Sequence, residues 1–436
     1  MKLSINNKEV TALPGESLIE TARREGFAIP SLCYAKDAKH RSSCMICAVK
    51  NDATGQIIPA CTTMPTEGMR IETDTQEVRL SRTLSLELLL SDHRADCEAP
   101  CGVACPGNMD VAAMNRLCDE GKTGEALALL RDTLVIPGTL CFICPAPCEK
   151  ICRKGAVDKP VAVREIKKSL VAQTDLDAIA PPAARNGKKI AVTGSDPAAL
   201  AAAYHLCKLG YAVTLFEPSG RMLAPYIDAE RVPADILALE TEVVRRMGVT
   251  LRHTSEPPSS GDFDAIIPQT KSRQPARMVL EGRRTAGHIH ASLSAGSMPE
   301  EGEGRVFNST YPRFTDAEKR RLNNHPPSTQ TNCLYCDCAG KTSCSLRRYA
   351  TEYGIKNTRY AKEGAREALH RRRIGAHIVF EPAKCIKCGL CVYNTDDGFT
   401  FSGRGFVMQV TLPEENENNI HEQVAELCPV SALYRI

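Results

Sequence analysis

The sequence predicts an α+β protein of several domains, and three observations lead to this prediction. The chain has 436 residues, which is enough for about three domains of ordinary size. Short β-type runs dominate the N-terminal part, whereas the segment after it has helical periodicity. From residue 189 onward, a strand, a tight turn and a helix follow one another, as in the opening of a βαβ unit.

The N-terminal elements predict a small β-grasp domain over residues 1–78. Its β-type runs alternate with one helical stretch, which ends before Gly26, a residue that favours the end of a helix. The expected strands are Met1–Ile5, Ala48–Asn51, Gln56–Pro59 and Met69–Glu72, and the expected helix is Ser17–Glu25.

Residues 79–180 are expected to form a helical domain. The helices Asp110–Glu120 and Thr123–Thr133 are predicted from the spacing of apolar residues, for example Leu127, Leu130 and Leu134.

An Ala- and Pro-rich linker, Ala178–Arg185, leads into a domain predicted at residues 186–300. The strand Lys189–Thr193, the helix Ala198–Leu209 and the strand Val213–Phe216 are the expected start of a Rossmann-type βαβ unit.

The remainder of the chain is predicted to contain a linker and two cysteine-rich parts. The composition from Pro257 to Pro327 is rich in Ser, Gly, Pro and Arg, which favours surface loops, apart from one helix at Ala276–Leu293. We place the linker at 301–330, a Cys-rich segment at 331–373 and a last domain at 374–436, with a basic helix around Lys362–Arg373.

The composition is that of an ordinary soluble protein, since 43% of the residues are apolar, 25% are charged and the net charge is +3. This balance favours neither nucleic acid nor a membrane surface as a partner. The N-terminal residues lack the apolar core of a signal peptide, and no run reaches the roughly 18 apolar residues of a membrane span. We therefore expect a cytoplasmic protein without membrane insertion. In that reducing compartment, clustered cysteines are expected to bind metals rather than to form disulfides.

Cysteine is the residue type that points most directly to function. Nineteen of the 21 cysteines fall into four groups with spacings typical of iron–sulfur ligands, and only Cys118 and Cys207 lie outside them. Cys118 is expected to pack within an amphipathic helix. The groups are Cys33, Cys44, Cys47 and Cys61; Cys97, Cys101 and Cys105 with Cys141, Cys144, Cys148 and Cys152; Cys333, Cys336, Cys338 and Cys344; and Cys385, Cys388, Cys391 and Cys428.

The first group provides four thiolates for one site. Its spacing, Cys33-x10-Cys44-x2-Cys47-x13-Cys61, differs from the plant-type ferredoxin pattern and from the two short Cys pairs of most zinc sites, although zinc is the alternative. The long first gap and the strings IPSLCY, ACTTMPTEGMRI and SINNKEV resemble the N-terminal [2Fe–2S] domain of the large iron–sulfur subunit of respiratory complex I and of multi-cluster hydrogenases. The resemblance implies one [2Fe–2S] cluster on these four cysteines.

The second group resembles the N-terminal domain of the glutamate synthase small subunit. The strings CGVACPGNMDV and CPAPCEKICRKGAVDKPVAV carry the resemblance, which extends from about residue 92 to residue 295. In that family, the two ends of a helical pair hold two [4Fe–4S] clusters with crossed ligation. By this resemblance, one cluster would be bound by Cys97, Cys101 and Cys152, and the other by Cys105, Cys144 and Cys148.

Each of these two sets lacks one ligand. For the first, His93 lies four residues before Cys97 and could supply an imidazole nitrogen, although a lone His is more often a capping or surface residue. For the second, the family often uses a carboxylate or an amide where this chain has Lys167, which is a poor ligand while protonated. Cys141 is the expected substitute, and Glu165 is the second choice.

The glutamate synthase family continues with an FAD domain into which an NADPH domain is inserted. In the corresponding turn Gly194 is present, but Asp196 stands where a second Gly would let backbone N–H groups approach the diphosphate. Glu217 is the expected acidic residue, whereas later contact points have changed to Gly220-Arg221 and Pro268-Gln269-Thr270.

The inserted NADPH domain is expected to be missing. The sequence passes almost directly from Asp262–Ile267, which resembles the end of the first FAD half, to Glu281–Leu293, which resembles the last helix of the family. We therefore expect a degenerate, truncated Rossmann-like FAD-type domain that supports the clusters. Retained FAD on Gly194 and Glu217 is the alternative.

The remaining two groups lie near the C-terminus. Cys385-x2-Cys388-x2-Cys391, followed by Cys428-Pro429, resembles one site of a bacterial-type ferredoxin and implies a single [4Fe–4S] cluster. Cys333-x2-Cys336-x-Cys338-x5-Cys344 could wrap another [4Fe–4S] cluster. The spacing of Cys336 and Cys338 is close, which leaves open that one of these two cysteines is free. Zinc, or no metal, is the alternative for this group.

Together these observations predict an iron–sulfur electron-transfer subunit with one [2Fe–2S] cluster and three to four [4Fe–4S] clusters. We expect no catalytic residue, because the sequence contains no recognisable catalytic Ser, Cys–His or paired-carboxylate arrangement. By resemblance, the chain would relay electrons between an NAD(P)H-linked flavin subunit and a low-potential partner, namely a hydrogenase, a formate dehydrogenase or ferredoxin, in a hetero-oligomeric complex. The alternatives are a flavin-dependent NAD(P)H oxidoreductase in its own right and a zinc-stabilised interaction protein.

Overall fold

The chain is a mixed α/β protein of several domains, as the sequence predicts. It divides into two compact units: unit 1 comprises residues 1–97, 304–313 and 337–436, and unit 2 comprises residues 98–303 and 314–336. Each unit is thus assembled from segments that are far apart in the sequence. The computed structural model describes residues 1–94, 96–179, 185–219, 222–223, 230–256, 258–269, 274–294, 307, 314, 316–324, 329–355, 360, 371–418 and 420–435.

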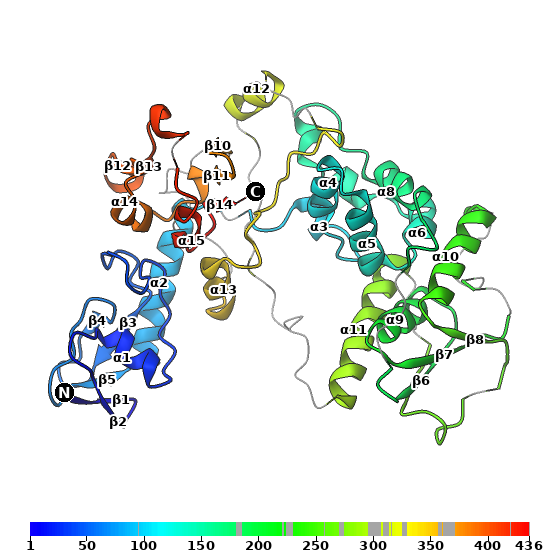
Figure 1. Ribbon diagram of the computed structural model, residues 1–436, viewed down its shortest axis with the longest axis horizontal. Helices are drawn as coiled ribbons and strands as arrows, with labels where there is room; N and C mark the ends of the chain where they lie inside the picture. The colour runs from blue at the N-terminus through cyan, green and yellow to red at the C-terminus, as the bar shows by residue number, and fades with distance from the viewer. Residues whose placement is uncertain are drawn as a thin grey trace. The chain divides into compact units, whose positions relative to one another are not determined.

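The N-terminal part of unit 1 is a five-stranded sheet in the order β2-β1-β5-β3-β4, with helix α1 beside it (Figure 1). Strands β1 and β5 are parallel, and the other neighbours are antiparallel. Alternate residues such as Leu3 and Ile5 pack with Leu18 and Ile19 of α1, because side chains alternate between the faces of a strand. The predicted helix and four predicted strands are confirmed, while β2 was not predicted. The elements are β1 (Lys2–Ile5), β2 (Lys8–Thr11), α1 (Leu18–Arg24), β3 (Ala48–Asn51), β4 (Ile57–Pro59), β5 (Arg70–Glu72) and α2 (Gln76–Asp92).

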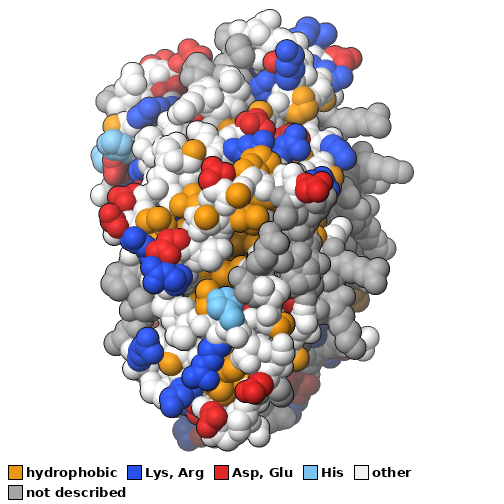
Figure 2. Space-filling model, turned by 90° about the vertical axis from the view of Figure 1, so that its right-hand side faces the viewer, with side chains coloured by type: hydrophobic (Ala, Val, Ile, Leu, Met, Phe, Trp, Pro, Cys, Tyr) orange, Lys and Arg blue, Asp and Glu red, His pale blue; other side chains and the backbone are white. Residues whose placement is uncertain are grey.

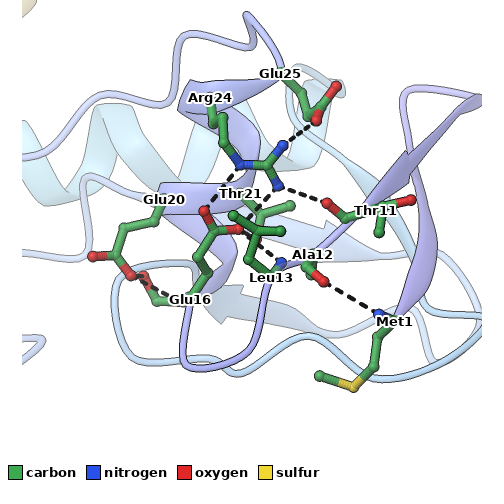
Figure 3. A network of polar contacts seen from close by, with 10 residues as sticks. Met1, Thr11, Ala12, Leu13, Glu16, Glu20, Thr21, Arg24 and Glu25 are labelled. Carbon is green, nitrogen blue, oxygen red and sulfur yellow. Dashed lines mark hydrogen bonds and ion pairs between the residues drawn. The ribbon is translucent and has the colours of Figure 1, made fainter.

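A polar network ties α1 to the edge strand of this sheet (Figure 3). Arg24, the last residue of α1, donates hydrogen bonds to the Glu16 carboxylate at 2.9 Å and to the Thr11 carbonyl oxygen at 2.6 Å. The amino group of Met1 donates to the carbonyl oxygen of Ala12 at 3.2 Å. The hydrogen bond from Arg24 lowers the pKa of Glu16 to about 2, so this carboxylate stays charged at neutral pH.

The C-terminal part of unit 1 contains two small antiparallel sheets, β10-β11-β14 and β12-β13 (Figure 1). Phe380 and Phe399 lie in its apolar core with their ring centroids 6.0 Å apart. The basic helix predicted at 362–373 is wrong at its described end, where Arg372–Ile374 forms strand β10, and residues 362–370 lie outside the described residues. The elements are α13 (Ser345–Glu352), β10 (Arg372–Ile374), β11 (Ile378–Phe380), η2 (Pro382–Lys384), α14 (Leu390–Asn394), β12 (Thr400–Ser402), η3 (Gly405–Val407), β13 (Gln409–Thr411), η4 (Glu414–Asn416), α15 (Val424–Leu427) and β14 (Leu433–Arg435).

The first part of unit 2 is helical (Figure 1). Helix α4 begins at Asp110, whose carboxylate accepts a hydrogen bond from the Ala113 N–H at 3.0 Å. Leu127, Leu130 and Leu134 of α5 are buried, as their spacing predicts. The elements are α3 (Pro100–Val103), α4 (Val111–Asp119), α5 (Thr123–Leu134), α6 (Pro137–Ile143), α7 (Pro147–Lys150), η1 (Arg153–Ala156) and α8 (Val163–Ala172).

No single helix among the described residues is long and apolar enough to cross a membrane. Helices α5 and α6 pass this test only as a pair, by length and composition, and they meet at a bend of 70°.

The second part of unit 2 is a parallel sheet in the order β8-β7-β6-β9, on which helices α9 and α11 pack (Figure 1). The contact between these helices is close, because a Cβ added to Gly282 of α11 would lie 2.1 Å from the Ala198 carbonyl oxygen of α9. The helix predicted at 276–293 is confirmed as α11. The elements are β6 (Lys189–Thr193), α9 (Pro197–Lys208), β7 (Ala212–Phe216), α10 (Ala234–Arg246), β8 (Thr250–Arg252), β9 (Ala265–Ile267) and α11 (Pro275–Leu293).

The segments predicted to be linkers are described only in part. Residues 180–184 of the first linker, and 301–306, 308–313, 315 and 325–328 of the second, lie outside the described residues. Within the second, the structure contains a helix that was not predicted, α12 (Asp316–Asn324).

The described surface carries charges of both signs. On the face shown in Figure 2, basic and acidic side chains are interspersed, with hydrophobic side chains exposed between them. The described residues on this face therefore show no field of a single sign, in keeping with a chain of 55 basic and 52 acidic residues.

Candidate metal centres

The first cysteine group converges in unit 1. Cys33, Cys44 and Cys47 lie on the chain between α1 and β3, and Cys61 follows β4; all four are buried. Hydrogen bonds from the Cys44 and Cys61 thiols lower the pKa of Cys33 to about 2, and a hydrogen bond from Cys61 lowers the pKa of Cys47 to about 7. Each of the four thiols is therefore within hydrogen-bonding reach of at least one other, which fits a centre with four thiolate ligands.

The C-terminal group also converges in unit 1. Cys385 and Cys388 precede α14, Cys391 lies within it, and Cys428 follows α15. The backbone N–H of Lys387 donates to the Cys385 sulfur at 3.3 Å, and that of Leu433 donates to the Cys428 sulfur at 3.5 Å. Burial, followed by repulsion from Cys388 and Cys428, raises the pKa of Cys391 to about 12. A bound metal cluster would offset the cost of a thiolate in this environment.

The first and the C-terminal groups are adjacent. Burial raises the pKa of Cys388, and the smaller causes include repulsion from Cys428, Cys385 and Cys33 of the first group. The Asn394 amide of α14 accepts a hydrogen bond from the Lys39 N–H at 2.6 Å and donates one to the Lys39 carbonyl oxygen at 2.7 Å. These contacts hold the loop of the first group against the helix of the C-terminal group.

A third set of buried side chains lies beside these two groups in unit 1. His93 ends helix α2, and Cys97 follows it closely. The Cys338 N–H donates to the Cys97 carbonyl oxygen at 3.1 Å, and Cys344 packs with Cys97 in one apolar cluster. Burial, followed by repulsion from Cys338 and Cys428, raises the pKa of Cys344 to about 11. Unit 1 thus contains three neighbouring sets of possible ligands.

In unit 2, a small cavity is lined by four cysteines from three stretches of the chain. They are Cys101 of α3, Cys152 after α7, and Cys333 and Cys336. Cys333 and Cys336, which were expected in one set with Cys338 and Cys344, thus line a cavity together with Cys101 and Cys152. Cys97 was expected with Cys101 and Cys152, but it is not among the residues that line this cavity.

A second cavity in unit 2 is lined by Cys105, Cys141, Cys144 and Cys148, together with Lys167. Burial raises the pKa of Cys141 to about 12 and that of Cys148 to about 11, and the positive charge of Lys167 partly opposes both shifts. The Ala146 N–H donates to the Cys144 sulfur at 3.4 Å.

The two candidates for the missing ligand of this set lie in different surroundings. Cys141 is in the cavity lining. Glu165 has a side chain that is 63% exposed and pairs with Lys168 at 3.1 Å. Cys141 is therefore better placed to complete the set.

A buried carboxylate positions the helix that carries Cys141. Glu240 accepts hydrogen bonds from the N–H groups of Gly138 at 2.6 Å and Thr139 at 2.8 Å, in the first turn of α6. These N–H groups have no partner within the helix, so the carboxylate fixes the helix end. Burial raises the pKa of Glu240 to about 7.

Among the described residues, no three or more Cys, His, Asp or Glu side chains are arranged to hold a single metal ion. An iron–sulfur cluster spreads its ligands over two or four irons, so its thiolates lie farther apart than those around one ion. The chemistry of the four-thiol sets, with N–H groups directed at sulfur, fits such clusters.

The dinucleotide turn of unit 2 does not fit FAD. The Asp196 carboxylate is buried and accepts hydrogen bonds from the Ala198 N–H at 2.7 Å and the Ala199 N–H at 2.9 Å. These are the helix N-terminal donors that a diphosphate would need. In addition, the Leu223 N–H donates to the Ser195 carbonyl oxygen at 3.2 Å, which brings the following loop over the turn.

The other predicted FAD contacts are occupied or outside the described residues. Gly194 has a φ of +88°, and a Cβ there would lie 3.2 Å from the Gln269 side chain. Glu217 is buried and accepts a hydrogen bond from the Ser219 hydroxyl at 2.7 Å. Gly220, Arg221 and Thr270 lie outside the described residues.

Comparison with known families identifies three domains in the chain. Residues 1–76 match the 2Fe–2S iron–sulfur cluster binding domain, residues 73–177 match dihydropyrimidine dehydrogenase domain II with its 4Fe–4S cluster, and residues 378–434 match the 4Fe–4S single cluster domain. The chain is thus an iron–sulfur protein with one 2Fe–2S domain and further 4Fe–4S domains, as the cysteine spacings predict.

Two curated relatives agree with this class of protein. The chain is 33% identical over 219 residues to the beta subunit of the NADP(+)-dependent formate dehydrogenase of Moorella thermoacetica, covering 42% of this chain and 31% of the relative. It is 29% identical over 202 residues to the small chain of glutamate synthase [NADPH] of Bacillus subtilis, covering 43% of this chain and 41% of the relative. The chain therefore spans less than half the length of these relatives.

A solved structure of an NAD+-reducing [NiFe]-hydrogenase in the H2-reduced state is also similar. It aligns with 100% of this chain and 86% of its own, at 11% identity and a TM-score of 0.39.

Proposed function

We propose that this chain is an electron-transfer subunit of a cytoplasmic, hetero-oligomeric oxidoreductase. It would relay electrons between an NAD(P)H-linked flavin subunit and a low-potential partner, namely a hydrogenase, a formate dehydrogenase or ferredoxin. The observation that carries the proposal is the adjacency of the ligand sets in unit 1, where Asn394 exchanges two hydrogen bonds with Lys39 and the Ser345 N–H donates to the Pro429 carbonyl oxygen at 3.1 Å. A relay requires such a series of neighbouring centres, whereas a single structural metal site does not.

The residues of unit 1 suit this role in two ways. The thiols of the first and third sets are buried and those of the C-terminal set are partly buried, and N–H groups such as those of Lys387 and Leu433 point at sulfur, where they stabilise added negative charge. When bound, iron–sulfur clusters supply one-electron transfer, while the two-electron chemistry of a nicotinamide belongs to the flavin of a partner. The similarity to a relative named as the beta subunit of an NADP(+)-dependent formate dehydrogenase supports a place in an oxidoreductase of several subunits.

The finer fold assignments belong to the same proposal. The N-terminal sheet with α1 would be a β-grasp [2Fe–2S] ferredoxin domain, and residues 374–436 would be a ferredoxin-like [4Fe–4S] domain. The parallel sheet of unit 2 would be the remnant of an FAD domain, since its strand order begins as a Rossmann fold does and Asp196 occupies the phosphate position.

The proposal is tested by supplying electrons with and without a flavin. The anaerobically purified chain is mixed with NADPH or NADH, alone or with a catalytic amount of a flavoprotein NAD(P)H dehydrogenase, and bleaching of the cluster absorbance is followed. We expect reduction only when the flavoprotein is present, and dithionite should reduce the chain in every case. Rapid oxidation of NAD(P)H by the chain alone would contradict the proposal and favour a flavin enzyme.

A Cys47→Ser/Cys61→Ser variant serves as the matched comparison. It removes two ligands of the first set and leaves the ligand sets of unit 2 unchanged. We expect slower reduction through the flavoprotein and unchanged reduction of the remaining clusters by dithionite. Equal rates in the variant and the parent would show that the first set is not on the path.

A further inference from the structure

We infer that Cys101, Cys152, Cys333 and Cys336 together bind one [4Fe–4S] cluster, so that the Cys333-x2-Cys336 segment completes the first cluster site of unit 2. This inference rests on the proposed function and deepens it, because it assigns ligands that neither the cysteine spacing nor the domain match at residues 73–177 assigns.

The four thiols face one cavity. All four line it, and their surroundings include Val161 and Val163, so the cavity is shielded from water on these sides. Burial raises the pKa of Cys101, and the next causes are repulsion from Cys333, Cys336 and Cys152. The four sulfur atoms are therefore close enough to sense one another, as ligands of one cluster must be.

The Cys333-x2-Cys336 segment is anchored to helix α4 on both sides of Cys333. The Asp119 carboxylate accepts hydrogen bonds from the Thr331 N–H at 2.7 Å, from the Thr331 hydroxyl at 2.6 Å and from the Tyr335 hydroxyl. The Arg116 guanidinium lies over the Tyr335 ring, 5.0 Å from its centroid. These contacts fix the segment against α4, whose Asn115 lines the same cavity as Cys101.

The backbone of the segment has the form of a ligand loop. Asn332 and Tyr335 both adopt left-handed conformations, with φ of +53° and +46°, which are costly for residues other than Gly. Their reversal of the chain brings the Tyr335 N–H to the Cys333 sulfur at 3.4 Å. Backbone strain that directs an N–H at a thiol is explained if that thiol carries negative charge as a ligand.

An independent observation comes from Asn115 of α4. Its side chain is fully buried and lines the cavity, and neither its amide nitrogen nor its amide oxygen has a hydrogen-bond partner among the described residues. A buried amide without a partner costs about 1–3 kcal/mol, so such groups usually face a ligand or water. The sulfide of a cluster would accept from this amide, and the cationic Arg153 and Lys154 in the lining suit an anionic occupant.

This assignment regroups the neighbouring cysteines. It leaves Cys338 and Cys344 for the site in unit 1 that also contains His93 and Cys97. Only one residue separates Cys336 from Cys338 in the sequence, so substitutions at these two positions can distinguish the two assignments.

The test is a substitution cycle with iron and sulfide analysis and electron paramagnetic resonance of the reduced protein. Single variants Cys101→Ser, Cys336→Ser and Cys338→Ser are each expected to lose or perturb one cluster of about 4 irons. The Cys101→Ser/Cys336→Ser double variant should lose no more than either single variant. The Cys336→Ser/Cys338→Ser variant should lose two clusters, about 8 irons. Cys207→Ser, a buried cysteine of α9 outside every set, is the control and should keep all iron.

The opposite result would overturn the inference. If Cys333 to Cys344 held a single cluster, Cys336→Ser/Cys338→Ser would lose only one, and adding Cys101→Ser would remove a second. The Asn115→Leu variant tests the inference without removing a ligand of the cluster. It should keep its iron but shift the midpoint potential of the resonance signal that is missing in Cys101→Ser and in Cys336→Ser. An unchanged potential for that signal would also contradict the inference.

The measurements distinguish a failure of this inference from a failure of the proposed function. A parent chain without iron and sulfide would contradict both proposals. A fully loaded chain that is reduced through a flavoprotein, but in which Cys336 and Cys338 act as one unit, would contradict only this inference.

Discussion

The Asp119→Ala variant is predicted to loosen residues 329–336 from helix α4 and to destabilise the proposed cluster site of unit 2. The Asp119 carboxylate accepts three hydrogen bonds, two from Thr331 and one from Tyr335. Hydrogen bonds to a charged acceptor contribute about 1.5–3 kcal/mol each when buried. Asp119 is partly exposed and water can replace it, so we take about 1 kcal/mol for each, or about 3 kcal/mol in total.

This free energy corresponds to a roughly 150-fold increase in the opening of the segment. The assay is anaerobic release of iron to a chelator present in excess, under conditions in which release follows the population of the open form. About 4 irons should leave the Asp119→Ala variant roughly 150-fold faster than they leave the parent, while the remaining irons leave at the parent rate.

Two further variants serve as an intermediate case and a control for the rate of iron release. Asp119→Asn should accelerate release only about 10-fold, since the Thr331 and Tyr335 hydroxyls can accept hydrogen bonds from the new amide. Glu120→Ala removes the neighbouring exposed carboxylate, which pairs with Lys122 at 2.8 Å, and should leave the release rate unchanged. Release from Asp119→Ala at the parent rate, or equally fast release of all iron, would refute the reasoning.

Three other predictions follow from unit 2. Burial lowers the pKa of His205 from 6.5 to about 4, so the stabilisation that the neutral ring provides is complete above pH 6.5 and declines as the pH falls toward 4. Between pH 8 and pH 5.5 the loss in the free energy of unfolding is about 1 kcal/mol. It is measurable as faster hydrogen exchange in α9 after correction for the intrinsic rate, and His205→Gln should abolish it. Gly282→Ala would place a Cβ 2.1 Å from the Ala198 carbonyl oxygen, and it should lower the free energy of unfolding of unit 2 in denaturant by about 2 kcal/mol. Gly287→Ala on the same helix has open space around it and should raise that free energy by about 0.5 kcal/mol. Asp196→Ala removes two cap hydrogen bonds from α9 and should cost about 1 kcal/mol, seen as roughly fivefold faster exchange in its first turn; unchanged exchange would contradict the capping role.

The parts of the fold that the sequence predicts are those that depend on local patterns. The strands and helix of residues 1–78 follow from alternation and capping, and α5 and α11 follow from helical spacing. The first and the C-terminal cysteine groups could likewise be assigned as sets, because each group lies within one small domain and its spacing matches a known ligand pattern. The 2Fe–2S domain match at 1–76 and the 4Fe–4S domain match at 378–434 span these two groups.

The grouping of the remaining cysteines depends on contacts between distant segments, which no local pattern contains. Cys333 is placed beside Cys101 by the bond between Thr331 and Asp119, two residues separated by 212 positions. The sequence nevertheless carried a signal, since the set around Cys101 was one ligand short and Cys336-x-Cys338 is unusually close for ligands of one cluster. A set that lacks a ligand, together with a group whose cysteines are too close for one site, indicates that the second group supplies a ligand to the first.

The remaining differences have similar causes. Helix α12 lies in a segment whose composition favours loops, and strand β10 pairs with β11, so backbone hydrogen bonds to a neighbour override the helical composition of the basic run. The role of Glu240 was also not predicted, because its partners Gly138 and Thr139 lie about a hundred residues away in the sequence.

The central claim, that this chain carries a series of iron–sulfur clusters for electron transfer, is tested most directly by metal, sulfide and flavin analysis of the anaerobically purified protein, with resonance spectra during stepwise reduction. The account predicts about 18 irons per chain with matching sulfide, neither zinc nor FAD in stoichiometric amount, and several one-electron signals that appear at different potentials. Stoichiometric zinc with little iron, or stoichiometric FAD with oxidation of NAD(P)H by the chain alone, would contradict it.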